Sequence, residues 1–213
     1  MKKYLSHLIR KYPELEECVP DINLAIELML GSINCNGKVL TCGNGGSASD
    51  AEHIVGELMK GFMHPRNLES IEIESIMQLY PEIGNEIVKN LQKPIPAISL
   101  TSNMAFITAY SNDVNPEYIF AQQVYGLGNK GDVLLCLSTS GNSKNVINAA
   151  MVAKVKGLNI IGFTGKSGGI LKEHADVLIK APSLITPEIQ EYHIAIYHTV
   201  CAQIEDDIFY KNN

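Results

Sequence analysis

Residues 38–50 read KVLTCGNGGSASD: a short apolar run, a glycine-rich turn and the start of a helical pattern. The run Lys38–Thr41 has the length and composition of a buried strand. A glycine-rich turn between a strand and a helix lets backbone N–H groups approach an anion. A tight turn that binds no ligand explains this motif equally well. The stretch therefore predicts a strand, a turn and a helix. It does not decide whether the turn binds a ligand.

The same succession recurs along the chain, because each of five short apolar runs is followed by a turn signal and a helical pattern. Such alternation predicts an α/β fold with a doubly wound parallel sheet and helices on both faces. The expected strands are Lys38–Thr41, Ala97–Leu100, Asp132–Leu137, Asn159–Thr164 and Val177–Ile179.

Helical patterns lie before and after these runs. Two are expected at about 2–18 and 21–35, the second opened by Pro20 with Asp21 as its cap. A last helix should start after Thr186-Pro187 and end near Ile208. It is apolar nearly all round, so we expect it to be buried on more than one side, with another subunit as one candidate cover.

The stretch between Phe62 and Pro94 contains Pro65, Pro81 and Gly84, which interrupt its helical patterns. We interpret it as a helical insertion at about 63–95. The whole chain, 1–213, is then expected to form a single domain.

Composition excludes several classes of protein. With 17 Lys and Arg against 23 Asp and Glu, the net charge of −6 indicates no nucleic-acid partner. No apolar run approaches the roughly 18 to 20 residues of a membrane helix, and the N-terminus mixes charges unlike a signal peptide. We therefore expect a soluble, cytoplasmic protein with no membrane partner. Its scattered cysteines are expected to be reduced and mostly buried: Cys18, Cys35, Cys42, Cys136 and Cys201.

The third expected strand ends in LSTSGNS, residues 137–143, and leads into another helical pattern. Serine or threonine at a helix start is often only a cap. Four hydroxyls exceed any need for capping, and together with backbone N–H groups they can bind a phosphate without Arg or Lys. The phosphate-binding candidates are Ser138, Thr139, Ser140 and Ser143.

Two pairs of residues could carry the chemistry. His53 and Glu57 are spaced i, i+4, so both project from one helix face toward a common metal or substrate. Alone, such a pair is more typical of an exposed His–Glu contact. On the last helix, Gln190 and His198 also share a face broadly, whereas His193 lies off that line and is interpreted as structural.

Four segments together resemble the bacterial phosphoheptose isomerases of the SIS (sugar isomerase) family, in order and in spacing. They read CGNGGSASDAEHIVGEL at 42–58, AYSNDVNPEYIFAQQV at 109–124, LSTSGNSKNVINAA at 137–150 and IQEYHIAIYH at 189–198. The resemblance implies a five-stranded, flavodoxin-like parallel sheet flanked by helices. It also implies a homotetramer with active sites at subunit interfaces.

The resemblance also implies a role for each matching residue. Substrate-contacting positions would be Asn44, Gly45, Gly46, Asn112, Asp113 and Gln190, and the four hydroxyl residues of 138–143 would hold the phosphate. Zinc ligands would be His53, Glu57, Gln190 and His198. Glu57 and His198 would also be the catalytic base and acid, with Glu57 contacting substrate. The implied reaction converts sedoheptulose 7-phosphate to D-glycero-D-manno-heptose 7-phosphate through an enediol.

Some positions depart from the family pattern. Lys60-Gly61-Phe62 stands where a Gly-Arg-Phe-like segment is usual, and Gln122 replaces a common arginine. Two alternatives therefore stay open at this point. One is a non-catalytic SIS protein that binds a replication initiator, although such relatives lack the catalytic Glu and His. The other is an isomerase of another ketose phosphate.

Overall fold

A computed structural model describes residues 2–210 and contains a five-stranded parallel sheet. Its strand order is β2-β1-β3-β4-β5, with every neighbouring pair parallel. The strands are β1 (Val39–Cys42), β2 (Ala97–Ser99), β3 (Val133–Leu137), β4 (Asn159–Thr164) and β5 (Val177–Lys180). Each lies within one residue of its expected position, and the predicted doubly wound α/β fold is confirmed.

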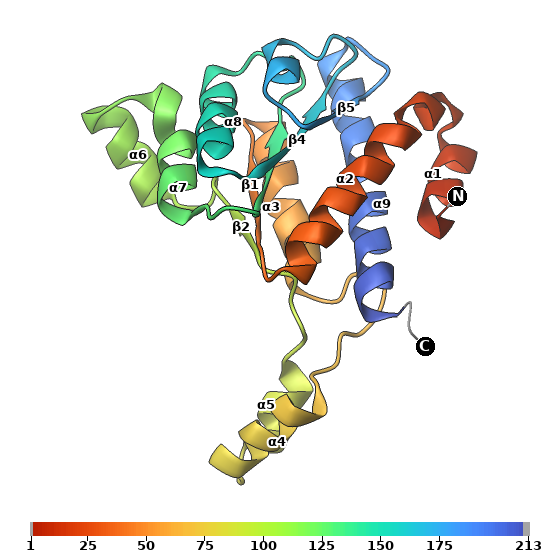
Figure 1. Cartoon of the computed structure of the whole chain (residues 1–213), viewed down its shortest axis with the longest axis vertical. Helices are drawn as coiled ribbons and strands as arrows, with labels where there is room; N and C mark the ends of the chain where they lie inside the picture. The colour runs from red at the N-terminus through yellow and green to blue at the C-terminus, as the bar shows by residue number, and fades with distance from the viewer. Residues whose placement is uncertain (1, 211–213) are drawn as a thin grey trace.

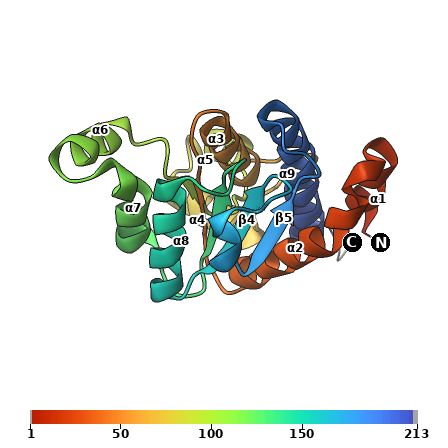
Figure 2. The same cartoon turned by 90° about the horizontal axis from the view of Figure 1, so that it is seen from above.

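Helices cover both faces of the sheet (Figures 1 and 2). Successive strand residues point to opposite faces, so on β3 Leu134 packs in one core and Leu135 in the other. One face is covered by α7 (Ile119–Leu127) and α8 (Lys144–Lys156). The other is covered by α2 (Val19–Asn34), α3 (Gly46–Met59) and α9 (Thr186–Phe209). Burial on both faces explains why the strand sequences are continuous apolar runs.

The N-terminal segment differs from the expected pair of long helices. Helix α1 (Lys3–Lys11) is followed by a short 3₁₀ helix, η1 (Pro13–Cys18), and only then by α2. The prediction of one helix over 2–18 was wrong, because proline disfavours helical backbone in the residue before it, and Tyr12 has φ −134° and ψ 76°. Helix α2 begins at Val19 with Pro20 in its first turn, so Asp21 is not its cap.

Helix α9 is long, with 24 residues, and it packs against α1, α2 and α3 of its own chain. The expectation that it is buried on more than one side is confirmed. Its cover comes from helices of the same protomer, so no second subunit is needed to explain its apolar sequence.

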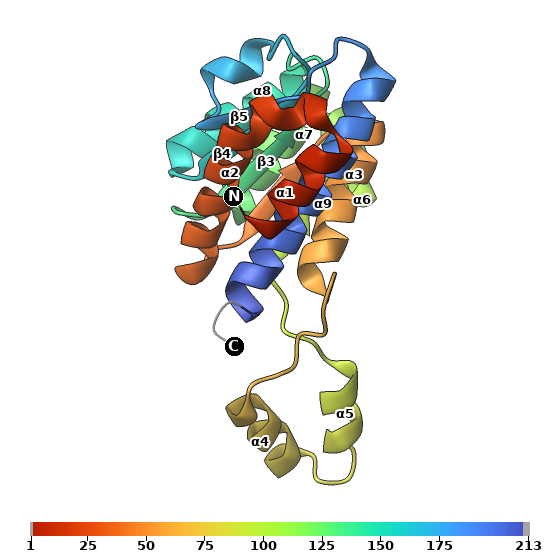
Figure 3. The ribbon, with the colours of Figure 1, turned by 90° about the vertical axis from the view of Figure 1, so that its right-hand side faces the viewer.

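The expected helical excursion contains α4 (Ser70–Leu79) and α5 (Gly84–Asn90), which project away from the sheet (Figures 1 and 3). Its neck is closed where Lys93 N donates to Arg66 O and Ile95 N donates to Leu58 O, both at 2.9 Å. Arg66 and Ile95 are buried, so the projecting part is slightly shorter than 63–95. The remaining elements are α6 (Met104–Asp113), η2 (Pro116–Tyr118) and η3 (Ile170–Glu173).

Four of the five cysteines are buried, as expected, and Cys35 is exposed. Burial is the main cause that raises the pKa of Cys18 to about 11 and that of Cys201 to about 12.

Within residues 2–210, every helix is too short or too polar to cross a bilayer.

Candidate active site

Helices α3 and α9 bring three of the predicted catalytic and metal-binding residues together. His53 and Glu57 lie one turn apart on α3, with Nε2 of His53 3.0 Å from Oε1 of Glu57. His198 reaches the same point from α9, and its Nε2 lies 3.5 Å from Nε2 of His53. Two imidazoles and a carboxylate from distant parts of the sequence therefore form one cluster, which is called the His–Glu cluster below.

Two residues that the sequence reasoning missed orient His53. The hydroxyl of Tyr197 lies 2.9 Å from Nδ1 of His53 and donates to Oδ1 of Asp50 at 3.3 Å. Asp50 and Tyr197 are both buried. Burial raises the pKa of Asp50, while the bond from Tyr197 and the nearby His53 oppose that rise. The one available signal was the i, i+3 spacing of Asp50 and His53 on a single helix face.

The segment after α3 also contributes to the cluster. Lys60 Nζ lies 3.1 Å from Oε2 of Glu57, so the two carboxylate oxygens of Glu57 face a lysine and a histidine respectively. The ring of Phe62 lies 5.5 Å from that of His198. The departure from the family pattern at 60–62 therefore falls directly at the site.

Burial affects the two histidines of α9 differently. The pKa of His198 is lowered by burial and by neighbouring His53, with Glu57 opposing, so this imidazole is mainly neutral at neutral pH. His193 is fully buried, and its Nε2 donates to the carbonyl oxygen of Thr164 at 3.2 Å. Burial lowers its pKa to about 4. The interpretation of His193 as structural agrees with this position in the core.

Gln190 and the glycine-rich turn lie against each other. Gly45 precedes α3 with a φ of 57°, which glycine adopts without strain. A Cβ on Gly46 would come within 2.3 Å of Nε2 of Gln190, so a larger residue there would push the Gln190 amide away. The structure thus places Gln190 beside Gly46, whereas Glu57 and His198 both contact His53.

An amide pair links the glycine-rich turn to the serine-containing loop. The side chains of Asn44 and Asn145 exchange two hydrogen bonds of 2.9 Å, and Asn145 lies in the first turn of α8. Because β1 and β3 are neighbours, their two following loops meet at the carboxyl edge of the sheet. This edge is where ligands bind in open α/β sheets.

The serine hydroxyls are not used as helix caps. Ser143 occupies the N-cap position of α8, yet its side chain makes no capping hydrogen bond. Its Oγ instead lies 3.0 Å from Oγ of Ser138. Ser140 Oγ accepts from the backbone N–H of Asn142 at 3.1 Å. The hydroxyls of Ser138 and Ser143 are therefore paired with each other in a position where an anion could replace that contact.

Further hydroxyl groups lie next to this loop. A hollow of about 210 Å³ is lined by Thr139 and Ser140 and also by three residues that the sequence reasoning missed. These are Ser167 and Ser183, from the loops that follow β4 and β5, and Thr186, the first residue of α9. Their only signal in the sequence was their position after strands.

Asn112 and Asp113 are not brought to the His–Glu cluster in this chain. Both are exposed on α6, which lies at the other end of the sheet from α9 (Figure 2). Asn112 Nδ2 donates to Asp113 Oδ1 at 2.9 Å. Among residues 2–210, no hydrogen bond joins either of them to the cluster.

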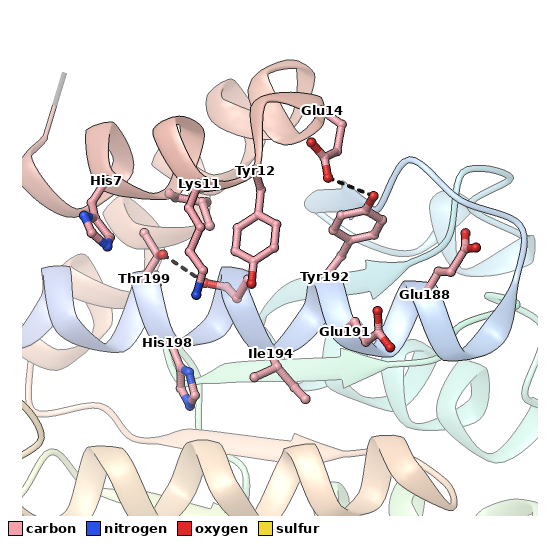
Figure 4. A pocket seen from close by; sticks show the side chains of 12 residues that line it. His7, Lys11, Tyr12, Glu14, Glu188, Glu191, Tyr192, Ile194, His198 and Thr199 are labelled. Atoms are coloured by element: carbon pink, nitrogen blue, oxygen red, sulfur yellow. Dashed lines mark hydrogen bonds between the residues drawn. The ribbon is translucent and has the colours of Figure 1, made fainter.

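A groove of about 720 Å³ runs between α1 and α9 (Figure 4). His7 and Lys11 of α1 line one side, and Tyr192 of α9 lines the other. Figure 4 shows that His198 projects from the side of α9 opposite α1. The groove therefore borders the cluster at His198 without containing the serine-containing loop.

The donor set of the cluster suits zinc, since imidazole and carboxylate are its usual nitrogen and oxygen ligands. The arrangement is that of a hydrogen-bonded network, however. In the part of the chain that the structure describes, no group of three or more His, Cys, Asp or Glu side chains is spaced to hold a metal ion. Metal binding would have to exchange the contacts of His53 with Glu57 and His198 for bonds to the ion.

Known proteins resemble this chain over nearly its whole length. The SIS domain family matches residues 3–78 and 73–165. A phosphoheptose isomerase of Rhodospirillum rubrum is 39% identical over 192 residues, which cover 90% of this chain and 88% of the relative. One from Helicobacter pylori is 36% identical over 211 residues, covering 99% and 96%. The chain belongs to the phosphoheptose isomerase family.

Solved structures of phosphoheptose isomerases agree with this assignment. Those from Neisseria gonorrhoeae and Francisella tularensis are each 33% identical to this chain, with TM-scores of 0.74 and 0.75. Each comparison covers 95% of both chains. The predicted relationship to the phosphoheptose isomerases is confirmed. It favours an aldose–ketose isomerase over the non-catalytic regulator.

Proposed function

We propose that this chain converts sedoheptulose 7-phosphate to D-glycero-D-manno-heptose 7-phosphate. The observation that carries the proposal is the meeting of Glu57 and His198 beside His53, in a chain of the phosphoheptose isomerase family. A carboxylate and a neutral imidazole are suited to moving protons between adjacent carbon and oxygen atoms.

Glu57 acts as the base in this proposal. Its carboxylate removes a proton from C1 of the ketose, and an enediol forms as the electron pair moves toward the C2 carbonyl. His198 supplies a proton to the carbonyl oxygen and takes one from the neighbouring hydroxyl. Glu57 then returns its proton to C2, which gives the aldose. Lys60, at 3.1 Å from Glu57, keeps a positive charge beside the carboxylate.

The phosphate is assigned to the loop that follows β3. The proposed ligands are Ser138, Thr139, Ser140 and Ser143, at the point where α8 begins. The N-terminus of a helix favours an anion because its first N–H groups have no carbonyl partner in the preceding turn. The unused capping position of Ser143 supports this role. The sugar is proposed to contact four residues at the same edge of the sheet: Asn44, Gly45, Gly46 and Gln190.

Zinc is the proposed cofactor, held by His53, Glu57, Gln190 and His198. Bound there, it would polarise the substrate oxygens as a Lewis acid. The donor chemistry supports this assignment, and Tyr197 would hold the ring of His53 in place from its Nδ1 side.

A homotetramer is proposed as the working assembly. The position of Asn112 and Asp113 supports it, because their distance from the His–Glu cluster within one chain requires a second copy if they contact substrate there. Analytical ultracentrifugation of the full chain should report four copies; a monomer at assay concentration would contradict the assembly.

The function is tested with a panel of ketose phosphates followed by NMR, with and without added zinc. We expect turnover of sedoheptulose 7-phosphate. Turnover of only a different ketose phosphate would move the assignment to that sugar, and no turnover of any member would overturn the enzymatic proposal.

A further inference from the structure

An ion pair lies fully buried behind the His–Glu cluster. The side chains of Arg66 and Glu205 are both 0% exposed, and Arg66 Nε lies 2.7 Å from Oε1 of Glu205. Arg66 belongs to the segment after α3, whereas Glu205 lies on α9 two helical turns beyond His198. Such a pair joins the two elements that supply the proposed base and acid.

Arg66 also caps the end of α3. Its Nη1 donates to the carbonyl oxygen of Leu58 at 2.6 Å, and its Nη2 donates to that of Glu57 at 3.1 Å. Carbonyl groups in the last turn of a helix have no partner within the helix. The guanidinium therefore binds the backbone of the very residue that carries the proposed base.

Glu205 fixes the segment that wraps around it. Its two oxygens accept from the backbone N–H groups of Phe62 and Met63, at 2.8 and 2.7 Å, in addition to Arg66. Burial would raise the pKa of Glu205, but these hydrogen bonds and the charge of Arg66 hold it below its ordinary value. Phe62, held in this way, places its ring beside His198.

We propose that Arg66 and Glu205 are positioning residues that set the spacing between Glu57 on α3 and His198 on α9. The inference rests on the proposed isomerase function. A guanidinium is needed because its planar fork reaches one carboxylate and two carbonyl groups at once, which a lysine ammonium on a flexible stem cannot reproduce. The pair acts through backbone and helix position, without touching substrate.

The chain offers a matched control for Glu205. Asp132 is another buried carboxylate that accepts two backbone N–H groups, from Lys38 at 2.9 Å and Asn129 at 2.8 Å, and pairs with the Lys38 ammonium. It lies just before β3, at the amino ends of the strands and away from the site. Glu205→Gln and Asp132→Asn thus remove the same kind of charge at two places.

The test measures kcat and KM with sedoheptulose 7-phosphate, together with melting curves. We expect Glu205→Gln and Arg66→Lys to lower kcat about tenfold to a hundredfold, as displaced catalytic groups do, with little change in KM. Asp132→Asn should lower only the melting temperature. An inactive wild-type chain would refute the proposed function. The positioning role of Arg66 and Glu205 would then be tested by a second measurement that does not depend on activity.

That second readout is the imidazole NMR spectrum of the intact chain. The ring signals of His198 and His53 should move in Glu205→Gln and in Arg66→Lys, and stay in place in Asp132→Asn. Folded Arg66→Lys protein with wild-type kcat and unmoved signals would overturn the proposal, even if Glu205→Gln failed to fold.

Discussion

The Nε2 atoms of His53 and His198 lie 3.5 Å apart although 145 residues separate them in the chain. Their contact depends on the packing of α3 against α9, because each histidine comes from one of these helices. The chemistry proposed for the chain is thus a product of helix packing on one face of the sheet, and changes that alter this packing should alter catalysis.

Zinc binding should depend on His53. Protein incubated with zinc and then dialysed should retain roughly one ion per subunit, and His53→Ala should lose it because an imidazole ligand is removed. His174→Ala, a change on a half-buried histidine after η3, is the control and should retain the metal. Absence of zinc uptake by the unmodified chain would mean that the cluster works as a hydrogen-bonded site.

The hydroxyls of the loop after β3 should bind the phosphate. Each hydrogen bond to a charged group contributes about 1.5–3 kcal/mol, so Ser138→Ala with Ser143→Ala should weaken phosphate binding at least about a hundredfold if the losses add. Both KM and inhibition by inorganic phosphate report this change. Asn103→Ala removes a genuine cap, since Asn103 Oδ1 accepts from Phe106 N, and should lower the melting temperature alone. Unchanged phosphate inhibition in the folded double variant would refute the assignment.

Stability should fall in acid because of His193. Its pKa is about 4 in the folded chain and about 6.5 when unfolded, so the unfolded state binds more protons between these values. The free energy of unfolding should therefore decrease as pH falls from about 6.5 to 4, by about 3 kcal/mol for this group. His193→Gln should remove that part of the pH dependence, as seen in urea melts at several pH values, whereas His174→Gln should keep it. Equal pH dependence in both variants would contradict the effect.

Much of the fold could be predicted from the sequence because each strand combines a buried apolar run with a turn signal. The five strands were located to within one residue of their bounds and α9 to within about two. The interruption at Pro13 was not foreseen because the apolar periodicity continues across it, although the proline itself disfavours helical backbone at Tyr12.

The site was predicted less completely, for a physical reason. His53 and Glu57 share a helix face, so their spacing indicated the contact directly. The bonds of Tyr197 to Asp50 and of Arg66 to Glu205 join segments more than a hundred residues apart, which no local pattern encodes. Arg66 carried one signal that could have been used: it is one of only two arginines in the chain, and it follows a proline at the neck of the helical excursion.

The central claim is that Glu57 moves the proton in a ketose–aldose isomerisation, and NMR of the reaction in deuterium oxide tests it most directly. The unmodified chain should form the aldose with deuterium at C2, because the abstracted proton exchanges with solvent. Glu57→Gln should slow this deuterium incorporation by about a hundredfold to ten-thousandfold with the fold intact. The control is Glu52→Gln, because Glu52 is exposed on the same helix and its carboxylate contacts Thr101. This variant should incorporate deuterium at the unmodified rate. Wild-type deuterium incorporation by folded Glu57→Gln protein would contradict the account.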